Sequence, residues 1–136
     1  MAGLERFIEA QELHYAQALQ EIKEGCKRSH WMWFVFPQLK GLGYSPTARY
    51  FAIEDREEAE KYVQHPLLGS RLLEISNELL KIESDDAAEV FGYPDDVKLH
   101  SSMTLFWLVS GNEVFKQVLD KYFDGKLCEF TEKHLS

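Results

Sequence analysis

Residues 96–109, with the sequence DVKLHSSMTLFWLV, indicate the fold class. Drawn as a helix, this segment is apolar around most of its circumference, because its apolar members are Val97, Leu99, Met103, Leu105, Phe106, Trp107 and Leu108. A helix that is apolar on several sides is buried on several sides. We therefore expect a central helix from about 96 to 109 with other helices packed around it.

The flanking segments predict those other helices. Apolar residues recur at steps of three and four along 4–22, 67–80 and 114–123, the spacing of one helix face. Shorter helices are expected at 46–53, from 56 to about 65 and from 86 or 87 to 91, and the C-terminus is expected to form one more turn or to fray. The start signals are Ser45 before Pro46, Asp55 with Glu58, Asp85 or Asp86, and Asn112.

One apolar block, SHWMWFVF at 29–36, fits a buried helix or a short strand. We favour a helix, because no other convincing strand is present to pair with it. The expected fold is therefore all-α: residues 1–136 form one compact multihelical domain of about eight short helices around the central helix.

Composition excludes several classes of protein. The chain has 136 residues, 45% of them hydrophobic, and a net charge of −8, which argues against general affinity for nucleic acid or anionic membranes. Cys26 and Cys128 form neither a disulfide framework nor paired zinc ligands. The N-terminus shows no signal or membrane-spanning pattern, so we expect a cytoplasmic protein. We also expect neither a bound metal nor a cofactor.

The charges are unevenly distributed along the chain. No acidic residue lies in 25–53 or in 97–112, and the first stretch holds two of the three tryptophans. If these stretches pack together, they form an electropositive, aromatic cavity suited to an anion on a flat-ringed ligand. Trp31 or Trp33 would stack the ring, and the other candidate ligand-binding residues are Arg28, Ser29, Gln38, Lys40, Arg49, Lys98, Ser101 and Ser102.

Each candidate also has a structural interpretation. The aromatic residues are equally typical of a core, and Lys98, Ser101 and Ser102, which share a helical face, either meet a ligand or bond to Asp95, Asp96 and neighbouring loops. Asp95 and Asp96 are more typical of a helix cap than of a metal site. His30 and His100 are candidate general acids or bases, or structural histidines, and no metal, nucleophile-elbow or phosphate-loop motif accompanies them.

Long motifs resemble a known family. KRSHWMWFVFPQ at 27–38, GLG at 41–43, SPTARY at 45–50, HPLLG at 65–69 and DDVKLHSSMTLF at 95–106 resemble the signature of a family of small, mainly bacterial proteins. That family is catalogued as a domain of unknown function, and some members carry the label calpastatin. The resemblance covers nearly the whole chain and implies an all-helical domain without an established activity.

A second, partial resemblance concerns SPTARYF at 45–51 and HPLLGSR at 65–71, which are similar in order and spacing to part of the NADAR superfamily. Its members cleave N-glycosidic bonds in ADP-ribose-like or riboflavin-pathway compounds. Their pattern has a glutamate–histidine pair where this chain has Ala48 and Arg49. The resemblance therefore implies binding of a nucleotide-like ligand without hydrolysis, or hydrolysis by another residue.

Three hypotheses follow. The first is binding of a phosphorylated, nucleotide-like small molecule related to ADP-ribose. The second is an N-glycosidase-type hydrolase in which His30 or His100 handles protons. The third is a protein interaction module with an exposed aromatic face.

Overall fold

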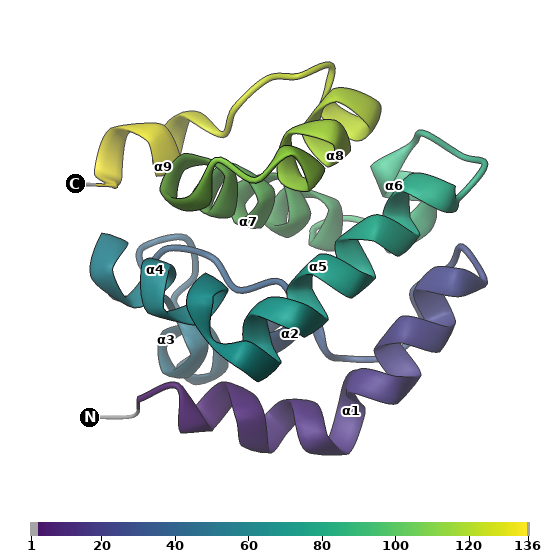
Figure 1. The fold of residues 1–136 in the computed structure, drawn as a ribbon. Coiled ribbons are helices and arrows are strands. Elements are labelled where there is room, and N and C mark those ends of the chain that lie inside the picture. The colour runs from purple at the N-terminus through teal and green to yellow at the C-terminus, as the bar shows by residue number, and fades with distance from the viewer. Residues whose placement is uncertain (1–2, 136) are drawn as a thin grey trace.

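Helix α7 (Asp95–Ser110) is the element around which the chain is arranged (Figure 1). The computed structural model describes residues 3–135, and within them α7 contacts α4 (Arg56–Gln64), α6 (Ala87–Phe91), α8 (Glu113–Phe123) and α9 (Glu129–His134). Its residues Leu99, Met103, Leu105 and Phe106 are fully buried. The predicted central helix is therefore confirmed.

Two long helices build the other half of the molecule. Helix α1 (Glu5–Lys23) packs on α5 (Pro66–Lys81), and α5 also contacts α4 and α8, so that α5 lies between α1 and the C-terminal helices (Figure 1). The short helices α2 (Met32–Val35) and α3 (Pro46–Phe51) contact each other. The all-α prediction is confirmed, with nine helices and no strand in residues 3–135 instead of about eight helices. No helix among them is long and apolar enough to cross a membrane.

Side chains at the predicted start signals cap the helices. The side chains of Ser45, Asp55, Asp86 and Asn112 accept hydrogen bonds from backbone N–H groups in the first turns of α3, α4, α6 and α8. His65 does the same for α5, because its Nδ1 accepts from the N–H groups of Leu67 and Leu68. These contacts are local in sequence, which is why sequence patterns predict them.

The apolar block at 29–36 is helical only from Met32 to Val35. The helix expected over the whole block is therefore too long, because residues 28–31 are held by a side chain of α1 instead of by helical hydrogen bonds. After the block, an isolated parallel bridge pairs Leu39 with Ile53. This bridge closes residues 40–52, including α3, into a loop.

Gly69 permits the close contact between α4 and α5. A Cβ atom at this position would lie 2.2 Å from the carbonyl oxygen of Val63, near the end of α4. No real Cβ contact is that short, so the crossing of the two helices requires glycine here.

Candidate functional site

A buried carboxylate organises the start of the basic stretch. Glu21 of α1 is only 3% exposed, and its Oε1 accepts hydrogen bonds from the backbone N–H groups of Arg28 (2.8 Å) and Ser29 (3.0 Å) and from the indole N–H of Trp31 (2.9 Å). Its Oε2 accepts from the hydroxyl of Ser29 at 2.5 Å. Burial alone would raise the pKa of Glu21, but these hydrogen bonds outweigh it and lower the pKa from 4.5 to about 2.

A second carboxylate joins the two acid-free stretches. Oδ2 of Asp95 lies 2.7 Å from Nζ of Lys27, and Oδ1 of Asp95 lies 3.0 Å from Nζ of Lys98. Burial opposes ionisation of Asp95, but the hydrogen bonds from Lys27 and Lys98 prevail and hold its pKa below the usual value. The two stretches thus meet through Lys27 and Lys98, and the residue between these lysines is an acid that lies just before the second stretch.

The two lysines also contact the tryptophans. Nζ of Lys98 lies 4.2 Å from the centroid of the Trp33 ring, and Nζ of Lys27 lies 5.0 Å from that of Trp31. Lys27 donates a further hydrogen bond of 2.5 Å to the carbonyl oxygen of Ser29. Each ammonium group is therefore fixed by contacts besides the shared carboxylate.

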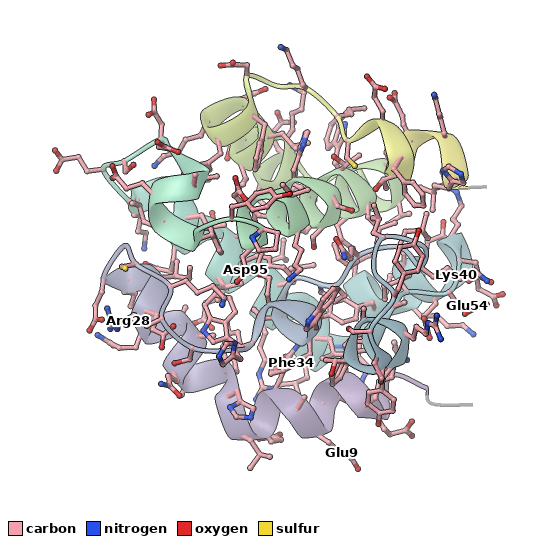
Figure 2. The ribbon with its side chains drawn as sticks, turned by 180° about the vertical axis from the view of Figure 1, so that it is seen from behind. Glu9, Arg28, Phe34, Lys40, Glu54 and Asp95 are labelled. Atoms are coloured by element: carbon pink, nitrogen blue, oxygen red, sulfur yellow. The ribbon has the colours of Figure 1, made fainter. Side chains whose placement is uncertain are left out.

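A cavity of about 130 Å³ opens at this cluster. Its lining combines charged, aromatic and polar side chains from the basic stretch, α3 and the start of α7, namely Lys27, His30, Trp31, Met32, Trp33, Phe34, Thr47 and Asp95. Figure 2 faces this side of the molecule, with Asp95 and Phe34 near its middle. An engineered apolar cavity of about 150 Å³ holds benzene, so the volume here suits one ring and not a whole dinucleotide.

The two candidate tryptophans differ in accessibility. Trp31 is 1% exposed and directs its indole N–H to Glu21, whereas Trp33 is half-buried and keeps part of its ring accessible. Trp31 therefore serves the core, with an edge at the cavity. Trp33 is the better placed of the two to contact a ligand.

The candidate histidines lie apart. His30 is exposed and lines the cavity. The Nε2–H of His100 donates to the carbonyl oxygen of Lys126 at 2.7 Å, and its ring stacks on Phe123 with centroids 4.3 Å apart. The structure thus brings His30, and not His100, to the cluster around Asp95.

The remaining basic candidates do not converge on the cavity. Arg28 pairs with Glu24 on the surface, and Lys40 pairs with Glu54 at 2.6 Å. Figure 2 shows Arg28 and Lys40 on opposite sides of the view, with Asp95 between them. Arg49 is an exposed residue of α3. Gln38 is buried beside the bridge, where its backbone carbonyl oxygen accepts a hydrogen bond from the backbone N–H of Ile53.

The three candidate serines do not meet at one place. Ser29 is engaged by Glu21, and Ser101 shares a hydrogen bond of 3.1 Å with Thr131 of α9. Ser102 is fully buried, and its hydroxyl has no hydrogen-bond partner among the described residues. Lys98, Ser101 and Ser102 therefore meet three different surroundings, although their spacing places them on neighbouring parts of one helix.

Glu21, Lys27, Thr47 and Asp95 were not among the predicted site residues. The sequence carries a signal for two of these residues, Glu21 and Asp95. Glu21 lies three residues after Ala18, on the buried face of α1, where a charged residue needs partners. The sequence around Asp95 is typical of a helix cap. The structure instead places Pro94 at the N-cap position of α7, and the carboxylate of Asp95 binds Lys27 and Lys98. No group of three or more histidine, cysteine or acidic side chains in residues 3–135 is placed to hold a metal.

Comparison with known proteins agrees with this fold. The model of the family described as "Protein of unknown function (DUF1810)" matches residues 1–135. The chain belongs to this family. A DUF1810 assignment confirms the resemblance to a domain of unknown function, and it carries no activity.

A solved structure resembles this DUF1810 chain over nearly its whole length. It is the crystal structure of the conserved hypothetical protein Rv1873 from Mycobacterium tuberculosis, with 46% sequence identity and a TM-score of 0.95 over 97% of this chain and 95% of that one. None of the curated proteins compared with the chain matches it. Neither match mentions calpastatin or the NADAR superfamily, so those resemblances remain predictions.

Proposed function

We propose that this DUF1810 protein binds an anionic, nucleotide-like small molecule at the cavity beside Asp95, with one ring of the ligand inside the cavity and an anionic group beside Lys27 and Lys98. The observation that carries the proposal is that Lys27, Trp33 and Asp95 line one small cavity, while Lys98 contacts both Asp95 and Trp33. Two lysines and one carboxylate leave a net positive charge there. ADP-ribose-related compounds are the first class to test.

The accessible ring of Trp33 and the apolar wall suit a flat ring. Met32 and Phe34 contribute to that wall, and Thr47 and His30 add polar groups. Ligand cavities commonly combine an apolar lining with a few polar groups that fix orientation. The site is small, so we expect it to enclose one ring of the ligand and not the whole molecule.

Isothermal titration of the full chain with ADP-ribose, NAD and nucleoside monophosphates tests this function. Binding tighter than millimolar is expected for at least one compound, and Lys98→Met should weaken it about tenfold, because the ammonium group and its hydrogen bonds are lost. The matched control is Lys40→Met, which removes an exposed lysine that pairs with Glu54 outside the cavity. The absence of binding across the whole panel would overturn the proposal.

A second candidate function is hydrolysis of an N-glycosidic bond, and the joint presence of Asp95 and His30 at the cavity favours it. Water would add to the anomeric carbon and the C–N bond would break. His30 would take the proton from the attacking water and, where the departing base is adenine, pass it to that base, while the carboxylate of Asp95 would stabilise the positive charge on the sugar. Release of free base from NAD or ADP-ribose, followed by chromatography, tests this step. His30→Gln should abolish the release and His100→Gln should not, and the absence of any release by the wild-type protein would exclude it.

A further inference from the structure

We propose that the carboxylate of Asp95 occupies the anion-binding position formed by Lys27 and Lys98, so that the anionic group of a ligand binds there by replacing it. This inference rests on the proposed function and adds a competitor built into the chain. Asp95 then weakens the binding of an anion, whereas the two lysines strengthen it. Its removal strengthens anion binding.

The geometry at the two lysines carries this inference. Each oxygen of Asp95 meets one ammonium group, at 2.7 Å for Lys27 and 3.0 Å for Lys98. Phosphate and carboxylate groups likewise present two oxygens on one atom, so the position that bridges the two lysines suits either of them. In the present structure an internal carboxylate fills that position.

The lysines keep other contacts that hold them in place without Asp95. Lys27 donates to the carbonyl oxygen of Ser29 at 2.5 Å, and its side chain is 7% exposed. Lys98 lies over the ring of Trp33. A pair of ammonium groups that is already oriented binds an anion with less loss of side-chain entropy than two free lysines would.

Local charge explains why Asp95 opposes a ligand. The charged or titratable side chains that contact its carboxylate or line the cavity beside it are Lys27 and His30 from the basic stretch and Lys98 from α7, and Thr47 of α3 is uncharged. An anion placed beside the ionised carboxylate meets a like charge and also competes for the same N–H donors. Without that carboxylate, the two ammonium groups that it bridges have free N–H donors at the place it leaves beside the cavity.

The test compares Asp95→Ala with the wild-type chain, using inorganic phosphate and acetate as probes. The alanine variant should bind phosphate about tenfold more tightly in isothermal titration, and its melting temperature should rise more per unit of added phosphate. Acetate should fill the place of the lost carboxylate and raise the melting temperature of the variant, with little effect on the wild type. Sodium chloride at equal ionic strength serves as the reference.

Asp96→Ala is the matched control, because Asp96 is the next residue of α7 and does not line the cavity. It should bind phosphate as the wild type does. If Asp95→Ala does not fold alone, phosphate or acetate should restore its helical circular dichroism, and chloride should not. Equal or weaker anion binding by Asp95→Ala, or no restoration of its fold, overturns the inference. The proposed function survives that result if wild-type protein still binds a nucleotide, whereas it fails if no ligand of the panel binds.

Discussion

The indole N–H of Trp31 donates a hydrogen bond of 2.9 Å to Oε1 of Glu21, and both side chains are buried. This contact links the end of α1 to the residue just before α2. It sets the course of the backbone through Arg28 and Ser29, whose N–H groups bind the same oxygen. The cavity beside Lys27 therefore depends on a carboxylate that does not line it.

Glu21→Gln should destabilise the fold by about 3 kcal/mol, because a buried network loses its charge and one acceptor oxygen becomes a donor that faces other donors. Urea denaturation followed by circular dichroism measures the change. Glu24→Gln is the matched control on the same helix, and we expect little change in stability from this exposed residue. A similar small loss in both variants would contradict the assigned role of Glu21.

Stability should fall as the pH is lowered from about 4.5 towards 2. The folded-state pKa of Glu21 is depressed from 4.5 to about 2, so its contribution is complete above the unfolded value and is lost as protons bind to the folded state. The depression corresponds to about 3 kcal/mol at neutral pH. Asp95, whose pKa is also lowered, adds to the same trend.

Urea titrations at a series of pH values measure this dependence. The Glu21→Gln variant should show a flatter profile than the wild type over the same range. An unchanged slope in that variant would show that other carboxylates cause the acid sensitivity.

Ser102→Ala should leave stability unchanged or raise it by about 1 kcal/mol, because its buried hydroxyl has no partner and desolvating it gains no hydrogen bond. Ser101→Ala is the comparison, since it removes the hydrogen bond to Thr131 and should cost about 1 kcal/mol. Thermal denaturation of both variants measures the difference. Equal destabilisation of the two would mean that Ser102 has a partner in solution.

Gly69→Ala should destabilise the protein by about 2 kcal/mol or more, although alanine normally favours a helix over glycine by about 1 kcal/mol. The sign reverses because the new Cβ would meet the carbonyl oxygen of Val63 at 2.2 Å, and α4 and α5 would have to separate. Ser70→Ala, at the next and exposed position, is the control and should have little effect. A stabilised Gly69→Ala variant would contradict the helix crossing.

The helices could be predicted because their signals are local. Ser45 and Asn112 bind N–H groups two or three residues ahead, and the apolar circumference of α7 identifies it as central. The segment at 28–31 could not be predicted in the same way. Its conformation depends on Glu21, a residue of another element, which periodicity within the block does not reveal.

The sequence indicates the basic, aromatic character of the candidate site, but it does not indicate which residues form the site. The absence of acids predicts a basic, aromatic cavity if the two stretches pack together, and Lys98 of the second stretch does contact Trp33 of the first. Arg28 and Lys40 share the first stretch but point to different sides, because the chain turns through α2 and the bridge between them (Figure 2). Asp95 lies two residues before a stretch defined by missing acids, so that criterion omitted the charge at the centre of the site.

The bridge between Leu39 and Ile53 holds together the base of the loop that forms one wall of the site. Two backbone hydrogen bonds, from Lys40 to Ile53 and from Ile53 to Gln38, fix both ends of the loop that carries Thr47 to the cavity. With the ends fixed, the number of residues between them should determine where that wall stands, within the limit set by Arg6 of α1, which binds the carbonyl oxygens of Tyr50 and Ala52 at the end of the loop. A relative with a longer or shorter loop would keep the helical fold but have a differently shaped entrance to the cavity. The length of this loop is therefore the feature to compare between relatives that bind different ligands.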